Sequence, residues 1–418
     1  MIEMIIPGTS VEVIAGERDA DLGVVGVVTM PLSLDWGAQV TTIRRGQDTT
    51  AVLGHRLSEM KLLNECMNYA NECIVYRLNT GTQAQGTLAS GITAKAVYGG
   101  TRGNDITVTV KPSDSKFVIK TFLGTVEQDS QIVSGPDGFV PNGFISIEGS
   151  GTLAEATVKL ENGTDGATED YESYFAEIQK HEYNVMAYTG SDKETAQKII
   201  DFIGEQRAAG AYVQCVVSGV AANNVAVYNS TVGGRTASYE LTAAEACATM
   251  AGIIAQCGIA GSATNFDVTG WTDVSPKLTK LQQESKTQSG EILFVQRYGG
   301  TQVLYDINSL TIYTEQQPED FHKGLVMRTL DKYATDLQKL LDTKAIGKIR
   351  NDINGRNEIK GLIAKMTTEE YLANRYIEGF TADDVTVETG KSRDSVKVTV
   401  GILVSDTVDK IYVTVIAE

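Results

Sequence analysis

The sequence predicts a multidomain protein of class α/β plus β. Three observations support this: a length of 418 residues, a Gly-, Thr-, Ser- and Val-rich stretch from about residue 84 to about 166, and alternating strand and helix patterns after residue 169. At about 150 residues per domain, this length corresponds to two to four domains. A hydrophobic fraction of 42% is enough for sizeable cores, which excludes a wholly disordered chain.

The N-terminal region combines an extended segment with a small α/β unit. Residues 1–22 contain β-forming residues, a helix-breaking Pro7 and a polar linker, so we expect an extended arm there. Within residues 23–90, a short apolar run predicts a buried strand, and apolar residues at helical spacing over 57–70 predict a helix. Residues 73–78 then have the pattern of another strand.

Residues 91–168 have the pattern of an inserted β-sandwich. Apolar Ile106, Val108 and Val110 alternate with polar residues, and several further short strands are separated by Gly- and Pro-containing turns. No convincing amphipathic helix interrupts these strands. The following stretch, residues 169–302, alternates strands and helices and predicts βαβ units with a mostly parallel sheet.

The remaining residues predict an α+β C-terminal domain over 303–404 and a linking strand over 405–418. A stripe that includes Val326, Leu330 and Tyr333 predicts a long helix at about 321–343, and a second helix is expected at 368–375. Two alternating strands follow, separated by a polar step at 405–410 that is too long for a two-residue hairpin. The second strand comprises Ile411, Tyr412, Val413, Thr414, Val415 and Ile416.

Charge and cysteine content exclude several functions. The net charge of -17 argues against a nucleic-acid binder and against an anionic membrane surface as partner. The chain has no apolar run of membrane-spanning length, and residues 1–9 lack the features of a signal peptide. Five cysteines without a C-x-x-C pair predict buried, reduced thiols, and hence synthesis in a cytoplasm.

The sequence contains no convincing catalytic or metal-binding motif. Its three histidines are scattered, and the spacings of a zinc site, a nucleophile elbow, a P-loop and a dinucleotide fingerprint are all missing. We therefore expect no cofactor, no metal and no enzymatic activity.

Two polar clusters allow alternative interpretations. Residues 98–105 (YGGTRGND) form either an anion-binding loop or a tight turn, and the turn is favoured because no helix follows. Residues 347–356 (GKIRNDINGR) form either a basic phosphate-clamping loop or a helix C-terminus followed by a turn at Asn354-Gly355. The surrounding stretch, 323–365, has ten basic and five acidic residues, which indicates either a solvated helix face or a docking face for an acidic partner.

The order of several motifs resembles the tail sheath family of contractile phage tails and tailocins, of the type found in Gram-positive bacteria. The similar stretches are residues 23–37 (GVVGVVTMPLSLDWG), 94–110, 160–166 (LENGTDG), 289–311, 328–331 (RTLD), 346–351 (IGKIRN), 354–356 and 394–415. The last of these ends in the family's D-x-x-x-K-I-Y-V-T-V pattern. Together they span nearly the whole chain.

The resemblance implies a structural subunit rather than an enzyme. It implies a subtilisin-like central domain without a catalytic triad, and a helical sheath of six-subunit rings around a tail tube. Baseplate and tail terminator proteins are the further expected partners, and a virion tail or tailocin assembled in the host cytoplasm is the expected location. Extended arms, with Val11, Glu12 and Val13 near one terminus and the strand 411–416 near the other, would pair with neighbouring subunits.

Lys339, Lys344 and Lys348 are the candidates for contact with the tube, because the resemblance implies an acidic tube surface.

Two other functions stay open from the residues alone. One is an α/β hydrolase with an appended β-sandwich binding module, which the missing catalytic spacing opposes. The other is a host surface adhesin, which the missing export signal opposes.

Overall fold

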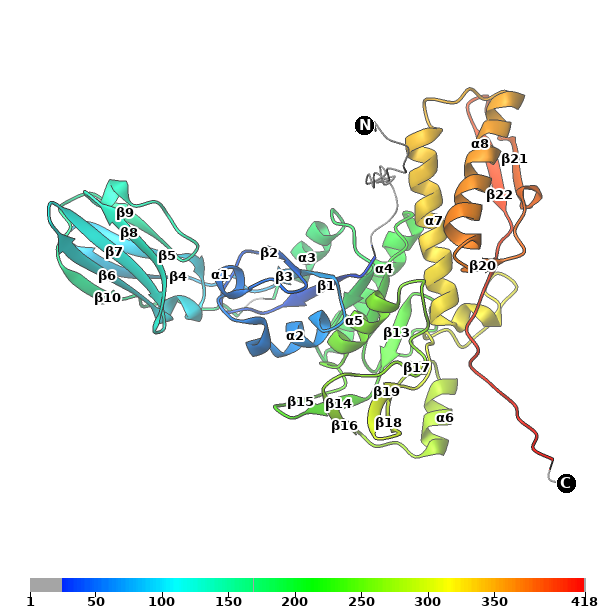
Figure 1. The fold of residues 1–418 in the computed structure, drawn as a ribbon, viewed down its shortest axis with the longest axis horizontal. Helices are drawn as coiled ribbons and strands as arrows, with labels where there is room; N and C mark the ends of the chain where they lie inside the picture. The colour runs from blue at the N-terminus through cyan, green and yellow to red at the C-terminus, as the bar shows by residue number, and fades with distance from the viewer. Residues whose placement is uncertain (1–24, 168, 417–418) are drawn as a thin grey trace, which may run out of the picture. The chain divides into compact units, whose positions relative to one another are not determined.

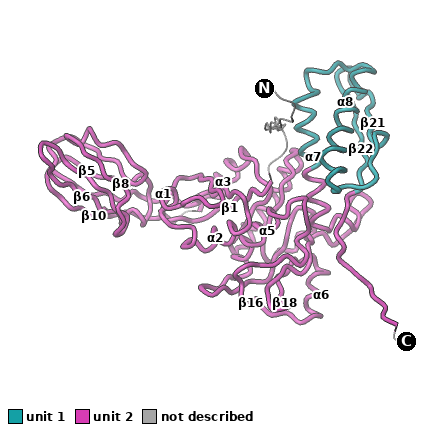
Figure 2. Tube along the Cα trace, in the orientation of Figure 1, with its two compact units in different colours: residues 1–23, 333–403 teal, residues 24–332, 404–418 magenta. Residues whose placement is uncertain are grey.

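The computed structural model describes residues 25–167 and 169–416. The chain divides into a larger unit, which extends to residue 332 and resumes at 404, and a smaller unit over residues 333–403 (Figure 2).

A seven-stranded sheet lies at the centre of the larger unit (Figure 1). Its order is β17-β13-β12-β11-β1-β3-β2, and every neighbouring pair is parallel except β2 with β3 at one edge. The strands are β1 (Val27–Leu32), β2 (Val40–Arg44), β3 (Glu72–Arg77), β11 (Val185–Ala187), β12 (Gln214–Val217), β13 (Val227–Ser230) and β17 (Glu291–Ile292). Since β1 pairs with β11, one sheet joins two regions that the sequence divided into separate domains at 23–90 and 169–302.

Helices cover both faces of this sheet. Val28 and Cys73 pack in the same core as α2 and α5, whereas the adjacent Val27 and Ile74 pack with α3 and α4. This follows from the strand geometry, in which successive side chains point to opposite faces. The helices are α1 (Thr50–Leu53), α2 (Lys61–Met67), α3 (Tyr171–Ile178), α4 (Lys193–Ala208) and α5 (Cys247–Cys257).

The β-sandwich is inserted between β3 and α3. One sheet has the order β10-β6-β7-β8 and the other β4-β5-β9, with a shared apolar core. The strands are β4 (Gln83–Ala89), β5 (Ile92–Gly99), β6 (Ile106–Ser113), β7 (Lys116–Leu123), β8 (Val126–Val133), β9 (Ile145–Gly149) and β10 (Ala156–Lys159). The predicted boundary at residue 91 therefore falls inside the sandwich, between β4 and β5.

Both crossings into the sandwich lie at one neck. A β-bridge joins Thr82 to Thr164, and Asn79 Nδ2 donates a hydrogen bond to the Asp165 carbonyl oxygen at 2.7 Å. The chain thus enters and leaves the sandwich at neighbouring points.

Short antiparallel elements complete the larger unit. They are β14 (Gly233–Thr236), β15 (Glu240–Leu241), β16 (Trp271–Ser275), α6 (Lys280–Gln288) and the hairpin of β18 (Phe294–Arg297) and β19 (Gly300–Val303). The buried Glu65 carboxylate accepts hydrogen bonds from Tyr239 Oη (2.7 Å), Thr249 Oγ1 (2.8 Å) and Trp271 Nε1 (2.9 Å). These bonds tie α2 to α5 and to the small sheet, and they offset the cost of burying the carboxylate.

The smaller unit is a helix pair with a β-hairpin. Helix α7 (Gly324–Lys344) starts in the larger unit and ends in the smaller one, and it confirms the long helix predicted near 321–343. Tyr371 Oη donates to Asp336 Oδ2 at 2.6 Å inside the core of this unit. The other elements are α8 (Ile353–Met366), a π-helical turn (Thr367–Leu372), β20 (Ile377–Glu378), β21 (Val385–Thr389), β22 (Val396–Val400) and β23 (Leu403–Val404).

One sequence prediction in this region is wrong. Asn354 and Gly355 lie in the first turn of α8 and not in a loop, because the Asp352 side chain caps that helix by accepting a hydrogen bond from the Gly355 amide at 2.8 Å. Over the described residues, none of the helices is long and apolar enough to cross a membrane.

Candidate assembly interface

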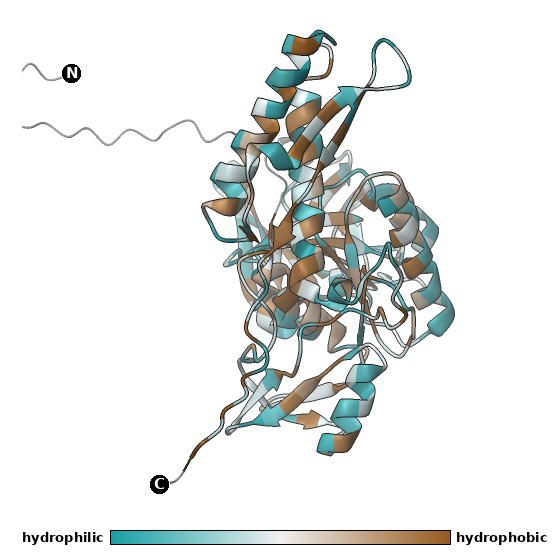
Figure 3. Cartoon of the chain, turned by 90° about the vertical axis from the view of Figure 1, so that its right-hand side faces the viewer, coloured by the Kyte–Doolittle hydropathy of each residue, from teal (hydrophilic) through white to brown (hydrophobic). Residues whose placement is uncertain are grey.

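The C-terminal arm, residues 405–416, is part of the larger unit (Figure 2). It forms no strand with any part of the chain that the structure describes. Its large apolar side chains face solvent: Ile411 is 78% exposed, Tyr412 91% and Val415 85%. The apolar colouring along the arm is visible in Figure 3. Exposed apolar side chains gathered in this way make the arm a candidate for coverage by another protein segment.

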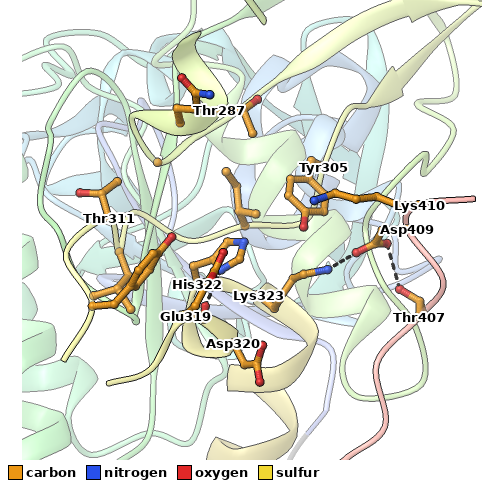
Figure 4. A pocket seen from close by; sticks show the side chains of 15 residues that line it. Thr287, Tyr305, Thr311, Glu319, Asp320, His322, Lys323, Thr407, Asp409 and Lys410 are labelled. Atoms are coloured by element: carbon orange, nitrogen blue, oxygen red, sulfur yellow. Dashed lines mark hydrogen bonds and ion pairs between the residues drawn. The ribbon is translucent and has the colours of Figure 1, made fainter. Parts of the chain in front are cut away.

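The root of the arm is held by one lysine (Figure 4). Lys323 Nζ lies 3.0 Å from Asp406 Oδ2 and also forms an ion pair with Asp409. The same ammonium group lies 4.9 Å from the centroid of the Tyr305 ring. The polar step at 405–410, expected as a tether, is thus attached to the larger unit through both aspartates.

These contacts keep Lys323 positively charged. Burial alone lowers the pKa of its ammonium group, but hydrogen bonds to Asp409, Tyr305 and Asp406 outweigh burial, and the pKa lies above its usual value. The stabilisation is therefore complete at neutral pH and is lost only in strong alkali, as the pH rises through the raised pKa.

A pocket of about 570 Å³ lies beside this root (Figure 4). His322 forms part of its wall, and its Nδ1 contacts the Glu319 carbonyl oxygen. Because a carbonyl oxygen only accepts, Nδ1 carries the proton in this contact. Other lining side chains are those of Tyr305, Tyr313, Lys323, Asp409 and Lys410.

The first turns of α7 are fixed within the larger unit by two ion pairs, one buried and one partly buried. Arg328 forms a bidentate pair with Asp306, at 2.8 and 3.1 Å, and Arg207 forms another with Asp331, at 2.7 and 2.8 Å. Burial disfavours the Arg328 charge, but the Asp306 carboxylate more than compensates and raises the Arg328 pKa. The RTLD motif thus has a structural role, since it supplies one partner of each pair, and Asp306 of the 289–311 stretch supplies the partner of Arg328.

The three candidate tube-contacting lysines do not form one flat face. Lys339 and Lys344 are five residues apart on α7, which separates them by roughly 140° around the helix axis. Lys348 follows α7, and its Nζ donates to the Thr343 carbonyl oxygen. It therefore caps the helix C-terminus, as the alternative interpretation of this basic stretch expected.

The other candidate of the assembly type, the N-terminal strand of Val11, Glu12 and Val13, lies outside the described residues. The YGGTRGND stretch forms a short 3₁₀ turn, Thr101–Asp105, ahead of β6. Asp165 accepts hydrogen bonds from the Thr101 amide and hydroxyl at 2.6 and 3.0 Å. This loop is thus part of the neck, in agreement with the turn interpretation.

The described histidines do not come together. His55 contacts Asp35, His181 contacts Glu177 of the preceding helix α3, and His322 contacts Glu319. No group of three His, Cys, Asp or Glu side chains among the described residues has metal-site geometry. All five cysteines are buried and unpaired, as predicted.

Sequence patterns did not identify Lys323, Asp406 and Asp409 as a group. The aspartates were visible only as part of the D-x-x-x-K-I-Y pattern, and Lys323 precedes them by more than 80 residues. A pair of acidic residues immediately before an apolar strand was the one signal available.

Known protein families match all three parts of this architecture. The phage tail sheath protein β-sandwich domain matches residues 79–165, the phage tail sheath protein central domain matches 166–309, and the phage tail sheath C-terminal domain matches 316–418. The chain belongs to the phage tail sheath protein family. Its fold is the multidomain sheath fold, with a β-sandwich and mixed α/β domains.

Solved sheath proteins have the same fold along almost the whole chain. The sheath tail protein of Desulfitobacterium hafniense is 30% identical, with a TM-score of 0.84 and coverage of 97% of this chain and 99% of that one. The sheath tail protein of Listeria innocua is 26% identical, also with a TM-score of 0.84, over 94% and 95% of the two chains. The phage-like element PBSX protein XkdK of Bacillus subtilis is 28% identical over 93% of this chain and 92% of its own length.

Proposed function

We propose that this sheath protein polymerises as a helical tube of stacked six-subunit rings around an inner tail tube, and that its contraction drives the tube through a bacterial envelope. The observation that carries the proposal is the exposed arm strand, in which Ile411, Val413 and Val415 alternate with Tyr412, Thr414 and Ile416. Such a segment fits the open edge of a sheet in a neighbouring subunit. Its exposure within one chain would otherwise be an aggregation hazard.

The strength of such a link suits a polymer. About five backbone hydrogen bonds at roughly 0.5–1.5 kcal/mol each give a few kcal/mol per arm. This is weak for one pair of subunits, but a helical assembly repeats the link at every subunit, so detachment requires many links to break together. The N-terminal residues Val11, Glu12 and Val13 form the second linking strand of the proposal.

The proposal assigns no catalytic activity to the chain. The central α/β domain is subtilisin-like without a catalytic triad, and the work of contraction comes from energy stored in the assembled sheath. The separate surroundings of His55, His181 and His322 support this assignment. Tail tube, baseplate and tail terminator proteins are the partners, and assembly takes place in the host cytoplasm before the particle is released.

The experiment is a truncation after Lys410, which removes residues 411–418 and keeps both aspartates on Lys323. We expect a folded monomer with an unchanged urea midpoint that forms no rings or tubes in negative-stain images, under conditions in which the full chain does. Normal tubes from the truncated chain would refute strand exchange. Failure of the truncated chain to fold would assign the strand to the core of its own subunit.

A further inference from the structure

The C-terminal arm divides at Lys410 into a held part and a free part. Asp406 and Asp409 contact Lys323, and their side chains are 35% and 9% exposed, whereas Tyr412 beyond them is 91% exposed. Figure 4 shows Asp409 turned inward to Lys323, with Thr407 beside it. The Thr407 amide donates to Asp406 Oδ1 at 2.8 Å, and its hydroxyl to Asp409 Oδ1 at 3.2 Å. The short segment therefore folds around the lysine and does not hang free.

The position of Lys323 connects the held segment of the arm to helix α7. Lys323 immediately precedes α7, and α7 is fixed in the larger unit by the buried Arg328–Asp306 pair. On the other side of the held segment lies β23, which is only two residues long. A pull on the arm would separate so short a strand easily, because few backbone hydrogen bonds hold it.

We propose that Lys323, Asp406 and Asp409 form a clamp that fixes where the arm leaves the subunit and carries tension from the arm into α7. This inference rests on the proposed strand exchange, and it names the residues that control the reach of the arm. Since residues 411–416 pair with the neighbour in that proposal, Lys410 is the connector left between the clamp and the paired strand. The clamp thereby keeps a linked neighbour close to the point where the arm leaves the subunit.

The chemistry of the cluster suits a durable clamp. Lys323 has a side chain only 15% exposed, so water and salt screen its ion pairs less than those of a surface lysine. The Tyr305 ring adds a cation–π contact. Removing the ammonium would leave the Asp409 side chain, which is only 9% exposed, without its ion-pair partner, at a cost in stability.

The test measures the mobility of a nitroxide label at two arm positions of matched exposure in the monomer. Val408, inside the held segment, is 79% exposed, and Val413, beyond it, is 76% exposed. Because all five native cysteines are buried, a cysteine placed at either position takes the label alone. We expect the label in Val408→Cys to move roughly fivefold more slowly than the label in Val413→Cys.

Variants of the clamp residues test whether Lys323, Asp406 and Asp409 restrain position 408. Lys323→Met, and separately the double change Asp406→Asn with Asp409→Asn, should raise the mobility at position 408 to that at 413. Lys280→Met, which removes a lysine that is 90% exposed, should leave both labels unchanged. If Lys323→Met fails to fold, the double asparagine variant still provides the test, because both of its substitutions lie in the arm.

Equal mobility at 408 and 413 in the parent chain, or no change in either clamp variant, would overturn the clamp. These measurements need no polymer, so they remain decisive if the parent chain forms no tubes, a result that would instead refute the proposed function. In tubes we expect the double asparagine variant to assemble more slowly than the parent and to break more readily during contraction. Assembly and breakage equal to those of the parent would refute the tension-carrying role.

Discussion

Strand β22 and the end of the C-terminal arm have similar local sequences but differ in whether they pair with another strand. β22 reads VKVTV and pairs along its whole length with β21, with Val398 opposite Val387. Residues 411–416 of the arm read IYVTVI and form no strand pair in the described chain. The two segments therefore have the same alternating pattern that favours a strand. They differ in that β22 has a neighbouring strand to pair with in the described chain and residues 411–416 do not.

The difference shows what each strand stabilises. β22 belongs to a hairpin that packs on α8, so its apolar residues contribute to the fold of the smaller unit. Residues 411–416 form no strand pair within the described part of the chain, and under our proposal their exposed apolar side chains gain burial from another chain. One pattern thus serves the fold in one place and, under our proposal, assembly in the other.

The largest effect is expected from the same substitution placed in both strands. Val398→Asp should lower the free energy of unfolding by about 2 kcal/mol, because it puts a charge at a half-buried position of the hairpin. Val413→Asp should leave the urea midpoint unchanged and abolish tube formation. The comparison breaks if Val413→Asp destabilises the monomer, or if its tubes look normal by electron microscopy.

An intermediate effect is expected from the arm supplied in trans. A peptide of residues 405–418 should compete for the acceptor edge and inhibit polymerisation of the full chain, with half-inhibition on the order of 100 µM given a link of a few kcal/mol. Light scattering follows the assembly. A peptide with Val413→Asp and Val415→Asp is the matched control, and equal inhibition by both peptides would mean that the effect is not strand addition.

The smallest effect is expected at the basic surface. Changing Lys339, Lys344 and Lys348 to Glu should reduce assembly on purified tail tubes several-fold while leaving self-polymerisation nearly intact, since exposed ion pairs give only ~0.2–1 kcal/mol each. Sedimentation with purified tail tubes measures assembly on the tubes, and sedimentation without them measures self-polymerisation. Reversal of the exposed Lys180, Lys193 and Lys198 is the control. Equal loss of both activities in the first variant would show that these lysines serve the fold.

Local patterns predicted most elements but not how they combine. The apolar stripe through Val326 and Tyr333 predicted α7 because a helix face repeats within a few residues. The pairing of β1 with β11 could not be predicted from local patterns, because the β-sandwich separates the two strands in sequence. Helix α8 was missed because Asn354-Gly355 has turn chemistry, which the Asp352 cap overrides.

The candidate assembly site was predictable in part for the same reason. The alternation at 411–416 is local and was visible, as were the lysines of α7. The clamp was not, because an ion pair between Lys323 and Asp409 depends on where two distant segments meet. Tertiary contacts of this kind follow from the fold and not from the spacing of residues along the chain.

The single neck of the β-sandwich has an evolutionary consequence. Because Thr82 and Thr164 lie side by side where the chain enters and leaves, the whole sandwich can be exchanged, enlarged or lost in one genetic event without breaking the central sheet. The same neck offers an insertion point for displaying a foreign domain on a particle.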